Sequence, residues 1–340
     1  MNVLINGIGN IGQTLLGVLC DHQNLLGIKN IFALKNTEIT DWNRQEIELL
    51  IQKGIVICTK NKSEHKLLDQ HIEHIDYVFD CTANSFGLKN KSWYENLSKL
   101  KGCCAQGSEK GFGIPFMSSI NNQQIKNNRY VQIVSCNTHA LSSLITTLSG
   151  QNPSNFEEGD FVIVRRSEDL GNHQRLVGAN VISRHLKESI GTHHAIDVKD
   201  LFDTKNIKLN IQSSDITTPS QLMHTVRFNL KLKNLPDQKT INTFIEGNPF
   251  VSSTTKFDSN IVFELGRRYS AYGRLFSHAI INSNNLLLDK QDRRIKGWAF
   301  IPQEGNTILS TVHAFLLQTQ NSDHQYIIEK LTAKLIQQKW

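Results

Sequence analysis

Cys136 is the residue of this chain whose surroundings best suit nucleophilic chemistry. An apolar run, residues 131–134, leads into Ser135 and Cys136, and a helical pattern of apolar residues then continues to Leu148. At a helix N-terminus the unpaired backbone N–H groups carry partial positive charge, which favours the nucleophilic thiolate over the thiol. The alternative is a small buried structural cysteine, which is what most free cysteines are. The rest of the chain must decide between the two.

A reactive thiol needs a base, and histidine titrates close to pH 7. Three candidates compete: His224, the pair His193-His194, and His139, which lies three residues along the same predicted helix as Cys136. Histidine is intermediate in burial, so a histidine packed in the core is an ordinary alternative for each. The residue pattern alone leaves this choice open.

Two adjacent arginines could bind an anionic substrate. Arg165 and Arg166 end the predicted strand 161–166. Side chains alternate between the faces of a strand, so we expect one arginine to reach the site and the other to pair with an acid or face solvent.

A glycine-rich turn predicts a dinucleotide site. Residues 2–6 read as a buried strand, Gly7-x-Gly9-x-x-Gly12 follows at once with Asn10 and Ile11 inside it, and a helical pattern comes next. Glycines there let the backbone turn tightly and approach a pyrophosphate at the helix N-terminus. The alternative is a glycine turn that binds nothing.

The second strand, residues 31–34, bears on the choice of cofactor. An NAD-selective fold places an acid about 20 residues beyond the glycines, to bind the ribose 2′-hydroxyl. This chain has Lys35 there, which suits the 2′-phosphate of NADP. A solvated loop lysine is the alternative.

The order of elements predicts an α/β protein with two domains. Strands and helices alternate up to residue 134, typical of a Rossmann-like doubly wound parallel sheet. Thr82 follows the strand that begins at residue 77, and Gly107 and Ser108 follow the strand 102–105, so these residues are expected at the cofactor cleft.

From about residue 138 the pattern changes to an α+β catalytic domain with a mixed or antiparallel sheet. Its predicted strands are 161–166, 207–211, 223–232 and 261–263. Helices are expected over 308–317 and 326–336. We therefore assign residues 1–137 to the nucleotide-binding domain, completed by 305–340, and residues 138–304 to the catalytic domain.

Composition narrows the class of protein. The 340 residues are 39% hydrophobic and 20% charged, and the formal charge of +6 is spread along the chain, which favours anionic small molecules over nucleic acid. The six cysteines lie in the first 136 residues without CxxC pairs, so neither a disulfide framework nor a zinc site is expected. No export signal or membrane span is indicated, and a cytoplasmic location is expected.

Taken together, the motifs resemble those of the archaeal-type (type II) phosphorylating glyceraldehyde-3-phosphate dehydrogenases, in the same order from residue 2 to about 310. The matching segments are residues 6–12; Asp80-Cys81-Thr82 with Gly87, Lys89 and Asn90; residues 106–110; Ser135-Cys136-Asn137-Thr138; Val164-Arg165-Arg166; His193-His194 with Asp197-Val198; Leu222-Met223-His224; and Gln303-Glu304.

The chain departs from this family in four places. Ser108 replaces a second glycine, His139-Ala140 replace a Thr or Ser–Gly pair, a Gly-Pro element after the arginines is missing, and residues 264–300 match poorly.

The resemblance implies a reversible reaction of glycolysis or gluconeogenesis: oxidation of D-glyceraldehyde 3-phosphate to 1,3-bisphosphoglycerate with NADP or NAD and inorganic phosphate, through a cysteine thiohemiacetal and thioester. It makes Cys136 the nucleophile and His224 the base, and leaves His139 as a core histidine. It also implies a homotetramer. The implied substrate and phosphate ligands are Ser135, Asn137, Thr138, His193, His194 and Arg166. The implied cofactor ligands are Gly7, Gly9, Asn10, Ile11, Gly12, Lys35, Thr82, Gly107, Ser108, Arg166 and Gln303.

Two other functions stay open. An aspartate-semialdehyde dehydrogenase shares the two-domain plan and a cysteine in a related motif, but its substrate carries a carboxylate and an amine instead of a phosphate. A catalytically altered paralogue would bind NAD(P) as a sensor, or bind RNA at its cofactor cleft. The presence of both Cys136 and His224 favours an active enzyme.

Overall fold

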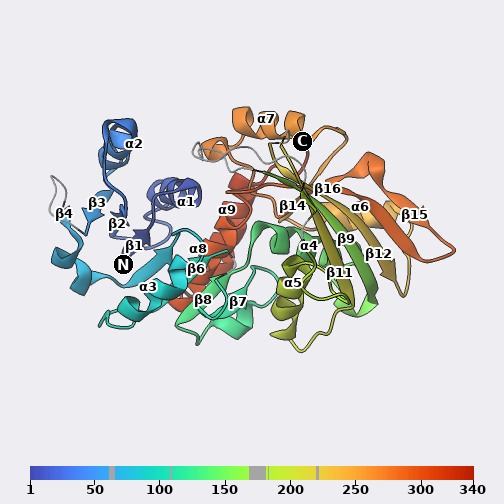
Figure 1. Cartoon of the computed structure of the whole chain (residues 1–340), viewed down its shortest axis with the longest axis horizontal. Helices are drawn as coiled ribbons and strands as arrows, with labels where there is room; N and C mark the ends of the chain where they lie inside the picture. Colours follow the sequence, from blue (N-terminus) through green and yellow to red (C-terminus); the bar gives the residue numbers. More distant parts are fainter. Residues whose placement is uncertain (61–65, 108, 168–180, 183, 220–221) are drawn as a thin grey trace. The chain divides into compact units, whose positions relative to one another are not determined.

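The computed structural model describes residues 1–60, 66–107, 109–167, 181–182, 184–219 and 222–340 (Figure 1). The chain forms two compact units. Unit 1 comprises Met1–Val134 and Ile308–Glu329, and unit 2 comprises Ser135–Thr307 and Lys330–Trp340.

This division differs from the predicted one at three points. The units part between Val134 and Ser135, and not after residue 137. Residues 305–307, predicted with the nucleotide-binding domain, belong to unit 2. Residues 330–340, predicted with the same domain, also count with unit 2. The reason is a set of backbone bonds: Ser253 N–H donates to the Gln338 carbonyl (2.9 Å), and Trp340 N–H donates to the Ser253 carbonyl (3.0 Å).

Unit 1 contains the predicted parallel sheet. Every described strand pair in it is parallel. Across the sheet the strands are β4 (Lys66–Leu67), β3 (Val56–Thr59), β2 (Asn30–Leu34), β1 (Asn2–Asn6), β5 (Tyr77–Asp80), β6 (Gly102–Gln106), β8 (Tyr130–Ile133) and β7 (Ile114–Phe116). The chain order reverses between β1 and β5, and at such a point a doubly wound sheet binds its nucleotide.

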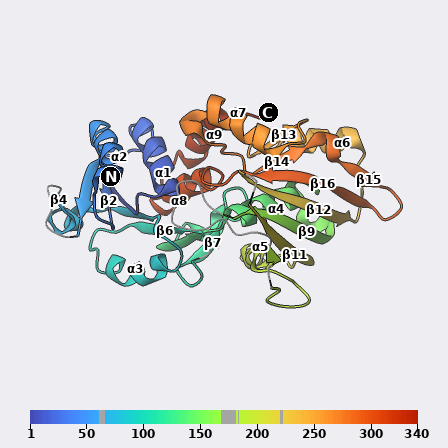
Figure 2. The same cartoon turned by 45° about the horizontal axis from the view of Figure 1, so that its top comes forward.

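Helices cover both faces of this sheet. Figures 1 and 2 show α1 and α2 on one face and α3 on the other. The helices of unit 1 are α1 (Asn10–Asp21), α2 (Asp41–Gln52), α3 (Phe86–Tyr94), α8 (Ile308–Gln318) and the first half of α9 (His324–Leu335). All of α8 is buried, and the Phe315 ring meets the Tyr77 ring edge-on at 5.0 Å. Residues 305–340 therefore contribute α8 to the core of unit 1.

Unit 2 contains a mixed sheet, as predicted. The strand order is β10 (Val181–Ile182), β11 (Ile211–Thr218), β9 (Phe156–Arg166), β12 (His224–Leu232), β16 (Arg294–Ile301), β14 (Ala279–Asn282) and β13 (Val251–Thr254), with β15 (Leu287–Asp289) paired to β16. Strands β9, β12, β16 and β14 are antiparallel neighbours, while β11 and β13 join in parallel. Buried and half-buried residues alternate along β12, so one face of the sheet lies against helices.

That face packs against α4 (Cys136–Leu148), α5 (His193–Asp203) and α6 (Gln238–Glu246). Helix α4 contacts β9, β14 and β16, and nearly all of it is buried. The first residue of this central helix is Cys136, so the packing of the unit 2 core fixes the position of the nucleophile candidate.

Two predicted strands of unit 2 are wrong. Residues 207–210 are irregular, and the strand β11 begins only at Ile211. Residues 261–263 lie inside the helix α7 (Ser259–Tyr269), because Asp258 caps it by accepting bonds from the N–H groups of Asn260 and Ile261 (2.7 and 3.3 Å). Among the described residues, no helix is both long and apolar enough to cross a membrane.

Candidate active site

The nucleophile candidate lies at a helix start that is capped by a side chain. Ser135 is the N-cap of α4, and its Oγ accepts a bond from the Thr138 N–H (3.3 Å) and lies 2.9 Å from the Thr138 hydroxyl. Cys136 takes part in no disulfide and is of intermediate exposure, and the Asn306 side chain donates to its carbonyl (3.0 Å). The Cys136 side chain is therefore reachable, while its backbone is held from both sides.

His139 belongs to the packing behind this turn. It is fully buried, its Nδ1 lies 3.0 Å from the Ser135 carbonyl, and its ring packs edge-on against His278 at 4.9 Å.

A buried histidine and carboxylate lie beside the first turn of α4. Asn137 Nδ2 is 3.5 Å from His194 Nδ1, and His194 Nε2 is 3.3 Å from Asp215 Oδ2. The side chains of His194 and Asp215 are 2% and 1% exposed. The same Asp215 oxygen accepts a bond from Arg165 Nη1 (3.1 Å). These contacts join four elements of unit 2, namely α4, α5, β11 and β9, in one polar cluster.

His193, which precedes His194 at the start of α5, is not a cation at neutral pH. Its ring lies 3.9 Å from the His194 ring, and burial together with the neighbouring His194 lowers the pKa of His193 to about 4. It can therefore bind a phosphate only by donating a hydrogen bond, not by charge.

The two arginines point to different partners, as strand alternation predicts. Arg165 pairs with Asp215 and is 37% exposed. The Arg166 side chain is 3% exposed; its Nη2 bonds Glu304 Oε1 (2.7 Å) and its Nη1 donates to the Leu222 carbonyl (3.0 Å). The resemblance assigns substrate binding to Arg166. The arginine that contacts the His194–Asp215 pair, however, is Arg165.

His224 is the first residue of β12 and is 6% exposed. Its Nδ1 accepts a bond from the backbone N–H of Arg166 (3.0 Å), and its Nε2 lies 3.0 Å from the Gln303 amide. Burial, followed by the positive charges of Arg166 and Arg165, holds the pKa of His224 well below its usual range. His224 is thus neutral at physiological pH.

The topology of the unit 2 sheet brings these residues together. Strand β9 ends at Arg166, and its antiparallel neighbour β12 begins at His224. On the other side of β12, Ile301 of β16 pairs with His224, so Gln303 and Glu304 follow at the same edge. Antiparallel pairing therefore places the end of two strands and the start of a third at one edge of the sheet.

Unit 1 carries the predicted glycine turn in a form that suits a pyrophosphate. Gly7 has φ +100°, and a Cβ on Gly12 would lie 2.1 Å from the Gly7 carbonyl oxygen, so neither residue can carry a side chain without movement. A Cβ on Gly9 would meet open space. Gly9 is the N-cap of α1, the helix that Asn10 and Ile11 begin, and no side chain caps it. The Gly7 N–H donates to the Leu34 carbonyl (3.1 Å), so an anion would be bound at the N-terminal end of α1, which carries no side-chain cap.

The other cofactor candidates of unit 1 lie at the ends of neighbouring parallel strands. Thr82 follows β5 and its N–H donates to Asp80 Oδ1 (2.9 Å), while Gly107 follows β6 with φ +78°. Lys35 follows β2, where its Nζ bonds the Thr37 hydroxyl and partial burial lowers the pKa of Lys35. Ser108 lies outside the described residues. Gln303, also a cofactor candidate, belongs to unit 2.

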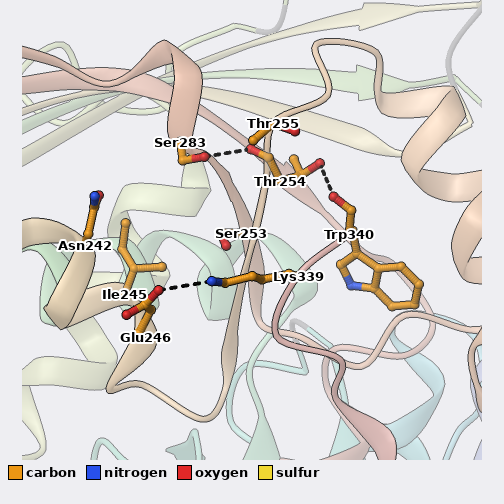
Figure 3. A pocket seen from close by; sticks show the side chains of 9 residues that line it. All are labelled: Asn242, Ile245, Glu246, Ser253, Thr254, Thr255, Ser283, Lys339 and Trp340. Atoms are coloured by element: carbon orange, nitrogen blue, oxygen red, sulfur yellow. Dashed lines mark hydrogen bonds and ion pairs between the residues drawn. The ribbon is translucent and has the colours of Figure 1, made fainter.

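A cavity of about 360 Å³ lies in unit 2, away from the predicted site residues (Figure 3). Its polar groups bond one another: Lys339 pairs with Glu246 (3.2 Å), Thr254 donates to the Trp340 carbonyl (2.8 Å), and Ser283 donates to the Thr254 carbonyl (3.2 Å). None of the predicted site residues lines it. The candidate site is therefore the polar cluster around Cys136 and not this cavity.

The sequence analysis gave no role to three residues of the candidate site. Asp215 orients His194, Glu304 neutralises Arg166, and Asn306 holds the Cys136 carbonyl. Glu304 stands in a matched motif, but nothing in the residue pattern gave it a role. Asp215 alternates with the buried Ser213, a period-two signal of a buried strand face.

The chain matches no protein-family model. It is 26% identical over 275 residues to a glyceraldehyde-3-phosphate dehydrogenase of Saccharolobus solfataricus, covering 78% of this chain and 76% of that protein. The same identity extends over 256 residues to the glyceraldehyde-3-phosphate dehydrogenase of Methanothermus fervidus, covering 73% of this chain and 72% of that protein. Along about three quarters of its length, then, the chain is similar to archaeal proteins of that name.

Proposed function

We propose that this chain is an oxidoreductase that converts glyceraldehyde 3-phosphate to an acyl phosphate, using NADP or NAD and inorganic phosphate. The observation that carries the proposal is a partly exposed cysteine at the first residue of a buried helix, next to the buried His194–Asp215 pair and the half-buried Arg165. A thiolate nucleophile, a base and cations for two phosphate groups are what this reaction requires.

The chemistry at Cys136 has three steps. The thiolate adds to the aldehyde carbon, and the carbonyl electron pair moves to oxygen, giving a thiohemiacetal. Loss of a hydride from this carbon leaves a thioester. Phosphate oxygen then attacks the thioester, the carbon–sulfur bond breaks, and the acyl phosphate leaves with Cys136 again as thiolate. Backbone N–H groups at the start of α4 are suited to stabilise the oxyanions.

A bound dinucleotide supplies the hydride acceptor. Gly7, Gly9 and Gly12 would hold its pyrophosphate, because the turn leaves open space at Gly9, beside the positive N-terminal end of α1. Lys35 with Thr37 would bind a ribose 2′-phosphate, which supports NADP as the preferred cofactor. The resemblance makes His224 the catalytic histidine and gives His193, His194 and Arg166 to phosphate.

A purified-protein assay that crosses two cofactors with two aldehydes tests the proposal. We expect reduction of NADP or NAD with glyceraldehyde 3-phosphate only when phosphate is present, and no turnover with aspartate semialdehyde. Cys136→Ser should abolish this activity, since a hydroxyl at neutral pH is a far weaker nucleophile than a thiolate. Substantial turnover by Cys136→Ser, or a preference for aspartate semialdehyde, would contradict the proposal.

A further inference from the structure

Unit 1 contains a polar cavity that the proposed reaction does not use. Its volume is about 320 Å³, and it lies beside the end of α8, the turn that joins α8 to α9, and the residues that follow the short 3₁₀ helix Asn122–Ile125. Its lining, as far as the structure describes it, belongs to unit 1 and includes no acidic residue. The polar residues of this lining are Lys126, Asn127, Gln320, Asn321, Ser322 and His324.

The polar groups of this cavity do not bond one another as those of the 360 Å³ cavity do. Within the described part of the chain, no residue bonds the side chains of Lys126, Gln320 or Ser322. Asn321 Oδ1 accepts a bond from the Asp323 N–H (2.8 Å), and no described residue bonds the Asn321 Nδ2 donor. Asp323, the acid nearest in the chain, is exposed and does not line the cavity. These donors are therefore available to a ligand.

Two histidines connect the cavity to the core of unit 1. His313 of α8 is 1% exposed; its Nδ1 lies 2.7 Å from the Ser118 hydroxyl, and its Nε2 lies 3.2 Å from Nδ1 of His324. His324, the first residue of α9, lines the cavity and is of intermediate exposure. Its second ring nitrogen, Nε2, bonds no residue that the structure describes. One side of the His324 ring is thus held by the core, and the other is left for a ligand.

Lys126 makes the cavity electropositive. Burial, then His324, then the charge of Lys126 lower the pKa of His313 to about 3. Burial, followed by the charge of Lys126, also lowers the pKa of His324. The ammonium group therefore lies within electrostatic reach of both rings, and a cation would be repelled from this place.

A phosphate group matches these donors in charge and in number of acceptors. It carries a charge of about −1.5 to −2 at pH 7 and three strongly accepting oxygens. Lysine binds phosphate as a point charge, while amide and hydroxyl groups donate to the remaining oxygens. An apolar ligand would find only Leu317 among the described lining residues.

We propose that this cavity binds the phosphate group of a small anion, with Lys126 as its charged ligand and His324 as a donor through Nε2. The inference goes beyond the reaction proposed at Cys136 and does not depend on it. Inorganic phosphate and a small phosphomonoester share the required chemistry, so the experiment includes both.

Binding of the anion should be coupled to a proton. A negative charge beside His324 favours its imidazolium form, which donates from both ring nitrogens. The charged and titratable groups around His324 are His313 of α8 and Lys126, with Asp323 preceding it in the chain. An anion whose own charge stays constant, such as sulfate, should therefore bind more tightly at pH 6 than at pH 8.

Hydrogen–deuterium exchange in the full chain, read on peptides that cover residues 317–327, tests the site locally. These peptides contain no residue of the candidate active site. Inorganic phosphate at millimolar concentrations should slow their exchange, and glycerol phosphate should do so at a lower concentration if the ligand is a phosphomonoester. Lys126→Gln should raise the half-saturating concentration about tenfold, because the charged ligand is lost, whereas Lys126→Arg should retain binding. In His324→Gln the affinity for sulfate should no longer change between pH 6 and pH 8.

Lys99→Gln is the matched control, since it removes an exposed lysine of unit 1 that does not line the cavity. Its half-saturating concentration should equal that of the wild type, and melting temperatures identify any variant that fails to fold. Two results overturn the inference: no protection of residues 317–327 at tens of millimolar phosphate, or equal losses of affinity in Lys99→Gln and Lys126→Gln. Oxidation of glyceraldehyde 3-phosphate is measured separately, so either proposal can fail without the other.

Discussion

At the scale of single residues, the site depends on buried charges that are held by specific partners. Glu304 pairs with Arg166 at 2.7 Å, and Arg274 Nε lies 3.4 Å from its other carboxylate oxygen. The Arg166 backbone in turn bonds His224. One carboxylate therefore helps to fix both the end of β9 and the start of β12.

We expect Glu304→Gln to destabilise the fold by about 3–5 kcal/mol, because it leaves the buried Arg166 charge without its counter-ion. Urea unfolding followed by circular dichroism measures this. Asp203→Asn, which removes an exposed ion pair with Lys208, should cost no more than about 1 kcal/mol. Equal effects in the two variants would contradict a structural role for the buried pair.

The sequence alone predicted the residues that belong to a local motif. It did not predict residues whose role depends on contacts with residues far away in the sequence. Cys136 was predicted as a site residue because a strand, a cap and a helix meet at it in the chain. Asp215 was missed because its partners, His194 and Arg165, are 21 and 50 residues away in sequence. Only the pairing of β11 with β9 brings such residues together.

At the scale of elements, the glycine turn between β1 and α1 performs two tasks. Gly7 and Gly12 allow the backbone to fold on itself, while Gly9 leaves room for a ligand.

Gly12 and Gly9 should therefore respond differently to substitution by alanine. Gly12→Ala should destabilise the chain by roughly 1–3 kcal/mol, since its Cβ would overlap the Gly7 carbonyl. Gly9→Ala should leave stability nearly unchanged and weaken dinucleotide binding by about tenfold or more. Thermal unfolding and fluorescence titration with NADP measure the two effects. A Gly9→Ala chain that binds NADP normally would show that the turn does not contact the cofactor.

Lys35, at the end of β2, should decide between the two cofactors. We expect Lys35→Gln to weaken NADP binding by about fivefold to tenfold, corresponding to about 1 kcal/mol, and to leave NAD binding unchanged. Lys53→Gln, at the exposed end of α2, is the matched control. Equal losses for both cofactors would mean that Lys35 does not contact the 2′-phosphate.

The elements that the sequence predicted correctly are those with long or periodic patterns. The strands β1, β2, β5, β6 and β8 of unit 1 and the alternating strand β12 were predicted from their apolar or alternating patterns, whereas the short strands β4 and β7 were not. The run 261–263 was assigned to a strand because three apolar residues cannot distinguish a strand from one turn of a helix. Asp258 caps the helix that contains these residues, and an aspartate before an apolar run can be recognised in a sequence as a possible helix start.

At the scale of the whole molecule, both units bury histidines. His224 and His278 lie in unit 2 and His313 in unit 1. Burial lowers the pKa of each, that of His313 to about 3. The unfolded chain therefore binds more protons than the folded chain below about pH 6.5.

Stability should thus be complete above about pH 6.5 and fall as the pH decreases toward the folded pKa values. Each buried histidine contributes up to about 1.4 kcal/mol per pH unit in that window. Urea midpoints between pH 8 and pH 5 measure the loss. A midpoint that stays constant down to pH 5 would show that these histidines are not neutral in the folded chain.

The thioester proposed at Cys136 is tested most directly by a rapid-mixing experiment without phosphate. Enzyme mixed with glyceraldehyde 3-phosphate and NADP should reduce about one equivalent of cofactor per active chain in a fast burst and then nearly stop, because the acyl group remains on sulfur. Adding phosphate should restore turnover. Steady cofactor reduction without phosphate, or no burst at all, would contradict phosphate-dependent catalysis through Cys136.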